Sequence, residues 1–224
     1  MSNKVVALLP MKRYSERIPN KNLLKMCGLP LFYHVLNELR KSKSIKSIVI
    51  NTDSQEIIDC CKQDFPNIIC TVRPNAICGD FVEMNEIIKY DISNLNGEHF
   101  LQTHSTNPLL SEKTISAAIA SYFDNLDEYD SLFSVNKIQT RLFNSNLRPL
   151  NHKKGELIRT QDLEPIYEEN SNFYIFSKTS FFDADRSRIG NNPYLYEMEK
   201  YESIDIDNMD DFILAETIME KKIL

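Results

Sequence analysis

The sequence lacks the glycine loops that most often hold phosphate groups. Only five of its 224 residues are glycine, and neither the P-loop pattern nor G-x-G-x-x-G occurs. Tryptophan is absent. No apolar run approaches the ~20 residues that cross a bilayer, and the first stretch, MSNKVVALLPMKRY, becomes charged too early for a signal peptide. We therefore expect a globular chain with no membrane partner.

The cysteine content and the net charge exclude further classes. The five cysteines include the adjacent pair Cys60 and Cys61 but no C-x-x-C. Neither a disulfide framework nor a zinc site is therefore expected, and a cytoplasmic location is favoured. The formal net charge is -6 and no long basic stripe occurs, which argues against nucleic acid as a partner. The length suits one sizeable core, so we expect a single domain over residues 1–224.

Short β-rich runs alternate with helical patterns. Continuous apolar runs predict buried strands at 5–10, 47–51, 68–72, 99–104, 130–135 and 172–177. Apolar residues at helical spacing predict helices that begin near residues 30, 54, 84, 111 and 209. This alternation predicts an α/β fold with an open, mostly parallel sheet and helices on both faces. Between about 139 and 170 the pattern weakens, which predicts an inserted hairpin, a lid or an oligomer contact.

A basic loop follows the first predicted strand. The stretch LLPMKRYSERIPNKNL carries Lys12, Arg13, Arg17 and Lys21 against the single acid Glu16. Ligands of open α/β sheets bind beyond the carboxyl ends of the strands, and these cations suit phosphate oxygens. The stretch therefore predicts a triphosphate site, although by itself it is equally compatible with a solvated surface loop.

An acidic pair lies near the other end of the sequence. In ESIDID, at 202–207, the alternation predicts a strand that ends with Asp205 and Asp207 on one face. Two carboxylates that project together suit Mg²⁺, which prefers oxygen ligands and bridges to phosphates. The alternative is that these carboxylates only cap the helix that follows.

Six motifs in order resemble one family over nearly the whole chain. They are PMKRYSERIPNKN, NTDSQEI, VRP with the later Asp80, LQTHSTNPLL, YEENSNFYIF and SIDIDNMDDFILAE. The sequence resembles the cytidylyltransferases that activate 2-keto-3-deoxy sugar acids, including the acylneuraminate (CMP-sialic acid), legionaminate, pseudaminate and Kdo enzymes. The resemblance implies a Rossmann-like three-layer nucleotidyltransferase fold with a small dimerisation element, and a homodimer.

The resemblance also implies a reaction and residue roles. CMP would pass from CTP to the anomeric hydroxyl of a sugar acid, and pyrophosphate would be released. The basic loop and the acidic pair would converge on one magnesium-bound triphosphate. The implied nucleotide-binding residues are Lys12, Ser15, Lys21, Asn22, Arg73 and Asp80, the metal ligands are Asp205 and Asp207, the acceptor residue is Gln102, and the catalytic residues are Lys12, Lys21 and Asp207.

Departures from the family pattern collect on the acceptor side. LQTHSTNPLL is longer than the family's LQPTSPLR, and Glu168 and Glu169 stand where the family often has arginine and proline. Lys12 replaces an arginine, and Glu16-Arg17 replaces lysine-glycine. The acceptor is therefore left open, with His104, Gln139, Arg141, Arg159, Gln161 and Asn170 as candidate pocket residues. The alternatives are another nucleotide or a non-sialic acceptor, or a catalytically silent nucleotide-fold subunit.

Overall fold

The computed structural model describes residues 3–221. The strands of its main sheet are β1 (Val5–Met11), β4 (Ile45–Thr52), β5 (Ile69–Val72), β6 (His99–Thr103), β7 (Ser131–Ile138), β8 (Ile166–Ser177) and β9 (Pro193–Glu197). A separate hairpin consists of β2 (Lys25–Met26) and β3 (Leu29–Pro30). The helices are α1 (Leu31–Lys41), α2 (Gln55–Asp64), α3 (Met84–Asn94), α4 (Glu112–Asp124), α5 (Lys178–Asp183) and α6 (Met209–Glu220), with short 3₁₀ turns at Lys21–Leu23, Asn75–Ile77 and Thr160–Asp162.

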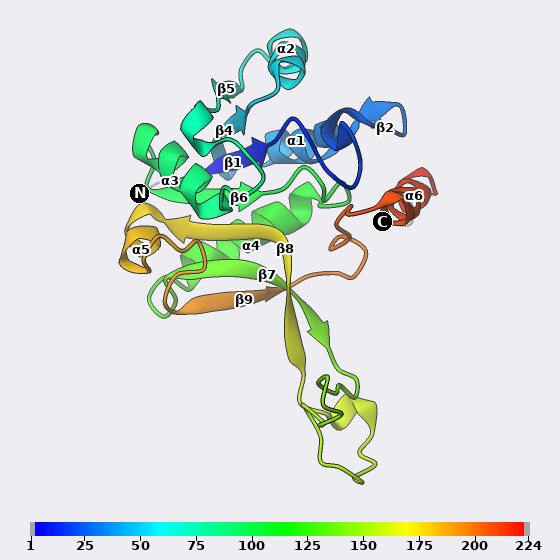
Figure 1. The fold of residues 1–224 in the computed structure, drawn as a ribbon. Coiled ribbons are helices and arrows are strands. Elements are labelled where there is room, and N and C mark those ends of the chain that lie inside the picture. The colour runs from blue at the N-terminus through cyan, green and yellow to red at the C-terminus, as the bar shows by residue number, and fades with distance from the viewer. Residues whose placement is uncertain (1–2, 222–224) are drawn as a thin grey trace.

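The main sheet has the strand order β5-β4-β1-β6-β8-β7-β9 (Figure 1). The first four of these strands are parallel to one another. β8 is antiparallel to both of its neighbours, and β9 is parallel to β7. The expected mostly parallel α/β sheet is confirmed, with β8 as its reversed strand.

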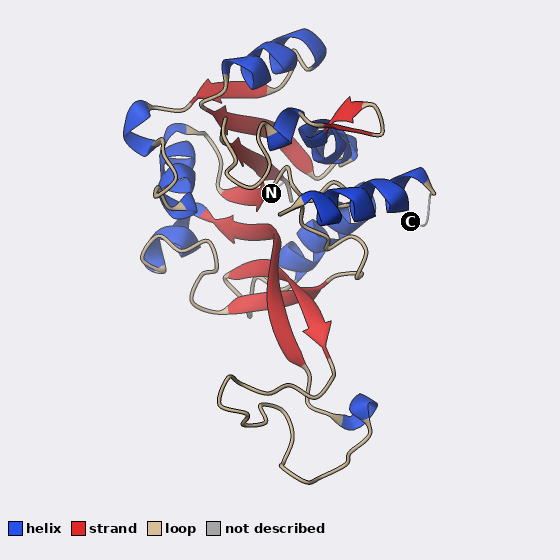
Figure 2. Cartoon of the chain, turned by 45° about the vertical axis from the view of Figure 1, so that its right-hand side comes forward, coloured by secondary structure: helices blue, strands red, loops and turns tan. Residues whose placement is uncertain are grey.

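Helices cover both faces of this sheet because its strands are apolar on both sides (Figure 2). Along β1, Val5 and Leu9 belong to the cluster that includes residues of α1, α2 and α4. Val6 and Leu8 point the other way, into the cluster with α3 and α5. Every residue of β1 is buried. A continuous apolar run in the sequence therefore corresponds to a strand between two helical layers.

The expected helix starts are also present. The Ser54 hydroxyl accepts a hydrogen bond from the amide of Ile57 at the start of α2, and Ser111 does the same for Thr114 in α4. Within residues 3–221, no helix combines the length and the apolar character that crossing a membrane requires. The cytoplasmic location stays a prediction.

The strand predicted at 202–207 is wrong. This segment begins in a turn and belongs to the loop between β9 and α6. Its Ile206 amide donates a hydrogen bond to the Thr106 carbonyl at 2.9 Å, and the Ile206 side chain is buried beside α6. The alternation of apolar and acidic residues reflects this anchored loop. The short strand β9, which pairs with β7, was missed.

The weakly patterned region forms a protrusion that we call the arm, residues 136–168. Here β7 and β8 continue as an antiparallel ladder past the body of the sheet, and residues 139–165 connect them at its tip (Figure 1). The ladder ends at the pair Ile138 and Ile166. The arm's part in dimerisation stays a prediction.

Candidate active site

A cleft of about 430 Å³ lies beyond the carboxyl ends of β1 and β6. Its walls come from the basic loop, from residues 73–87 and from residues 104–106. All six predicted nucleotide-binding residues line it, together with His104: Lys12, Ser15, Lys21, Asn22, Arg73 and Asp80. A larger hollow of about 810 Å³ lies between α1 and α6, but no predicted site residue lines it.

The basic loop holds its shape without glycine. The Arg13 amide donates to the Asp53 carboxylate at 2.6 Å, which joins the loop to the end of β4. Ile18 is buried near α6. The chain turns at Asn20, whose φ of 54° lies in the left-handed region, where asparagine is tolerated better than most residues. Side-chain anchors thus replace the flexible turns of a glycine loop.

Asn22 joins the basic loop to the loop after β6. Its Nδ2 donates to the Lys12 carbonyl at 3.0 Å, and its Oδ1 accepts from the Ser105 hydroxyl at 2.6 Å. Both polar ends of the side chain are therefore used within the protein. Asn22 positions the two walls of the cleft relative to each other.

Lys21 lies against the acidic pair. Its Nζ donates to the Ile206 carbonyl at 2.5 Å, directly between the two aspartates in sequence. Burial lowers the pKa of Lys21, and the charges of Asp205 and Asp207 partly oppose that shift. The basic loop and the SIDID segment, more than 180 residues apart in the sequence, therefore meet beside the cleft. Asp205 and Asp207 do not line the cleft itself.

The two aspartates differ in their surroundings. Asp205 is partly buried, and its Oδ1 has no hydrogen-bond partner among the described residues. Burial raises its pKa. Asp207 is more open and pairs with Arg17 at 2.7 Å. Neither side chain caps α6, because Asn208 supplies that cap.

The exposed cations of the cleft are paired with acids. Lys12 and Asp80 are 3.0 Å apart, and both side chains are about half exposed, as are Arg17 and Asp207. Exposed pairs of this kind are worth less than ~1 kcal/mol. They are therefore easily exchanged for contacts with phosphate oxygens.

Arg73 belongs to a buried network at the wall of the cleft. Its Nε donates to Asn51 Oδ1 at 2.9 Å, and its Nη2 donates to the carbonyls of Met11 and Asn51. Asn51 in turn donates to Asp91 Oδ1 at 2.6 Å. Sequence reasoning missed Asp91. An acid on the inward face of the predicted helix 84–95 indicates a buried polar network.

Asp91 is expected to make stability depend on pH. Burial raises its pKa to about 6 from an ordinary 3.8, so the folded chain binds this proton more tightly than the unfolded chain. That contribution is lost as the pH rises through about 6. Asp91→Asn should therefore gain roughly 2 kcal/mol in free energy of unfolding relative to wild type between pH 4 and pH 8. Urea unfolding followed by circular dichroism measures this, with the exposed Asp59→Asn as control. Parallel pH curves for wild type and Asp91→Asn would contradict it.

Gln102 and His104 are linked behind the cleft wall. Gln102 is fully buried. Its Oε1 accepts a hydrogen bond from Arg188 Nη1 at 2.7 Å. The amide Nε2 of Gln102 is therefore directed toward His104 Nε2, at 3.1 Å. His104 Nε2 is therefore the acceptor. Burial lowers the pKa of His104 to about 3, so the ring is neutral and its Nε2 lone pair is engaged.

Of the predicted acceptor residues, His104 lines the cleft, whereas Gln102 and the candidates in or near the arm do not. Gln139 donates to the carbonyls of Gln161 and Leu163 within the arm. Arg159 pairs with Asp162 at 2.7 Å, and Arg141 donates to the Ile158 carbonyl. Asn170 bonds with Ser134 and Asn136 at the base of the arm. Their contact with an acceptor stays a prediction.

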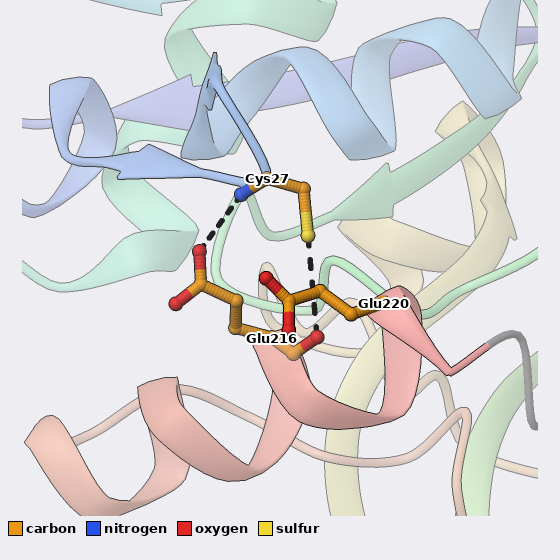
Figure 3. A group of neighbouring side chains, drawn as sticks. All are labelled: Cys27, Glu216 and Glu220. Atoms are coloured by element: carbon orange, nitrogen blue, oxygen red, sulfur yellow. Dashed lines mark hydrogen bonds between the residues drawn. The ribbon is translucent and has the colours of Figure 1, made fainter.

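Cys27, Glu216 and Glu220 form a separate exposed group, with ligand atoms within 4.8 Å of one another (Figure 3). The Cys27 amide donates to Glu216 Oε1 at 2.8 Å. Burial and the two carboxylates raise the pKa of the Cys27 thiol, which disfavours the thiolate that binds metals. This group joins the β2–β3 hairpin to α6.

Comparison with solved structures defines the class of fold. A CMP:2-keto-3-deoxy-manno-octonic acid synthetase complexed with CTP matches with a TM-score of 0.71 and 11% identity, over 98% of this chain and 99% of that chain. The likeness shows that both chains share the three-layer α/β fold.

The sequence comparisons define the family. A family model described as cytidylyltransferase matches residues 6–223, so the chain belongs to the cytidylyltransferase family. The CMP-N,N'-diacetyllegionaminic acid synthase of Legionella pneumophila is 26% identical over 97% of both chains. The N-acylneuraminate cytidylyltransferase of Streptococcus agalactiae serotype III is 25% identical over 94% of this chain. The chain spans about half the length of that relative, 52%.

Proposed function

We propose that the protein transfers CMP from CTP to the anomeric hydroxyl of a 2-keto-3-deoxy sugar acid of the sialic acid type. The contact of Lys21 with the Ile206 carbonyl carries this proposal, because it places the cationic wall of the cleft beside the segment that bears Asp205 and Asp207. The family and the names of the relatives, which describe sugar-acid cytidylyltransferases, support it. The structural neighbour named as holding CTP supports the choice of nucleotide.

The residues present fit Mg²⁺. Asp205 keeps an unpartnered buried oxygen, which costs stability unless a ligand satisfies it. Asp207 adds a second carboxylate, which forms an exposed pair with Arg17. Carboxylate oxygens are the donors that Mg²⁺ prefers. When bound, the ion would neutralise negative charge on the triphosphate.

The chemistry requires positioning and charge compensation. The acceptor oxygen attacks the α-phosphorus of CTP, the bond from that phosphorus to the bridging oxygen breaks, and pyrophosphate leaves as the acceptor hydroxyl loses its proton. Lys12 and Lys21 would bind the departing phosphates. His104 does not suit the role of base through Nε2, because that atom already accepts from Gln102. Alignment of the reactants is the main contribution of the protein.

One assay separates this proposal from its alternatives. Pyrophosphate release would be measured with each nucleoside triphosphate, with and without Mg²⁺, against sialic, legionaminic, pseudaminic and Kdo-type acids. Magnesium-dependent release with CTP and at least one of these acids is expected. Release with another triphosphate would reassign the donor. No release with any acid would favour a silent nucleotide-fold subunit.

We further propose that the arm supports a homodimer. It exposes five large hydrophobic side chains, among them Leu147 at 82% and Leu157 at 91%. Exposed apolar groups gathered on one element are typical of protein interfaces. Leu147→Glu/Leu157→Glu should raise the dimer dissociation constant at least ~100-fold, which sedimentation equilibrium measures. Leu126→Glu, outside the arm, is the matched control. A wild-type monomer, or a double variant that dimerises normally, would contradict the proposal.

A further inference from the structure

Arg188 is a partly buried cation without an acidic partner. It lies between α5 and β9, and among residues 3–221 no carboxylate forms an ion pair with it. Its guanidinium carbon is 3.8 Å from the centre of the Tyr174 ring, and Nη1 donates to Gln102. The Glu169 carboxylate acts on Arg188 from beyond ion-pair distance, and a desolvated charge without a direct acidic partner is costly. The site is therefore suited to an anion supplied from outside the chain.

The position of Arg188 connects it to the cleft. Gln102 contacts Arg188 through one end of its amide and His104 through the other. His104 lines the cleft that also contains Lys21. The charges of both Arg188 and Lys21 help to lower the pKa of His104, after burial. His104 thus lies within reach of two cations, one beside the acidic pair and one on the Gln102 side.

The Arg188 guanidinium is held in a fixed orientation and keeps N–H groups that can donate to a ligand. It stacks on Tyr174, and the Tyr174 hydroxyl bonds with Glu169 and with Ser171. Nη1 donates to Gln102 Oε1, and the guanidinium also contacts the Tyr174 side chain. A stacked arginine keeps its edge N–H groups free, and that edge matches a carboxylate in two-point contact.

Within residues 3–221, the other cations of the cleft and the two arm arginines expected from sequence already have partners, so Arg188 is the cation left for the carboxylate of the acceptor near Gln102. Arg17 and Lys21 lie beside the SIDID segment, and Lys12 pairs with Asp80. Arg141 and Arg159, the cations expected from sequence, lie in the arm and bond there. We propose that Arg188 recognises the carboxylate of the acidic acceptor and so determines acceptor specificity, an inference that rests on the proposed function.

The test compares Arg188→Gln with Arg186→Gln. Arg186 lies in the same loop but is exposed and pairs with Glu86 at 2.9 Å, so it is the matched control. With any acid that wild type accepts, Arg188→Gln should raise KM for the acid roughly 30-fold or more and leave KM for CTP within about twofold. A purely structural role would change both constants or neither. An unchanged acceptor KM, or an equal rise in both constants, would overturn the inference.

A binding measurement decides the inference separately from turnover. Calorimetry would compare the free acids of the panel with their methyl esters, which lack the charge. Wild type and Arg186→Gln should prefer the acid about tenfold or more, and Arg188→Gln should lose that preference. Binding with the expected preference but without pyrophosphate release would contradict the proposed function while supporting the role of Arg188. Wild type that shows no preference for the acid would overturn the inference.

Discussion

Asp205→Asn is expected to lower kcat for pyrophosphate release about 10³-fold, a loss of ~4 kcal/mol in transition-state stabilisation. Asp205 places a buried, unpartnered oxygen next to Lys21. An amide keeps the shape of the side chain but removes the negative charge that would hold Mg²⁺. The effect should appear in kcat at saturating CTP, and added Mg²⁺ should restore little of it. Asp207→Asn should also abolish most turnover.

The stability of the same variant separates a lost metal ligand from a damaged fold. Burial raises the pKa of Asp205, so its ionised form is disfavoured in the folded chain and stability is gained as the pH falls. Asn removes that penalty, and the variant should unfold at the same temperature as wild type or higher at pH 8. The control is Asp210→Asn, on the exposed first turn of α6. A kcat within about threefold of wild type would remove the metal hypothesis.

The proximity of the basic loop and Arg73 could be predicted because both follow parallel strands of the sheet. The basic loop follows β1 and Arg73 follows β5, and both strands end at the same edge of the sheet. Residues placed after such strands must meet there, whatever the details of their loops. The six residues predicted to bind the nucleotide therefore line one cleft. The roles of these residues stay predictions.

Irregular segments limited the prediction elsewhere. The alternation in ESIDID resembles a paired strand because Ile204 and Ile206 both pack into the cluster that contains α6, although they do so from a loop. Two residues shortly before Arg188, Asp185 and Arg186, have left-handed backbone angles. Neither of them is glycine, the residue that usually marks such a turn in a sequence. Its contact with Gln102, 86 positions earlier in the sequence, depends on the reversed strand β8. No local pattern encodes that proximity.

The acceptor residues expected in the arm show the same limit. Arg141 and Arg159 were chosen for their charge, which can be read from sequence. Their hydrogen bonds depend on how the tip of the arm folds back on itself. Turn-rich segments have no periodicity that fixes the direction of a side chain. Charge alone therefore identifies Arg141 and Arg159 as candidate acceptor residues but does not predict their positions relative to the cleft.

Lys21→Met should weaken CTP binding roughly 10- to 100-fold, because it removes a charge-assisted contact with phosphate. The side chain is partly buried, with its Nζ between the cleft and the acidic pair. Burial lowers its pKa, so wild type should lose CTP affinity as the pH rises into a range where an ordinary lysine is still charged. The variant should show no such loss. Calorimetry at several pH values measures both effects.

Lys25→Met is the matched control, because Lys25 is the exposed residue of the hairpin strand β2, four positions later. It should bind CTP as wild type does. If Lys21 serves only to hold the Ile206 carbonyl and shape the SIDID segment, its loss would lower the unfolding temperature and leave the pH dependence of CTP binding unchanged. A pH-dependent affinity that disappears only in Lys21→Met instead requires the ammonium charge to face the nucleotide. The same result would mean that the lysine following Asn20 in the glycine-free loop supplies the phosphate contact.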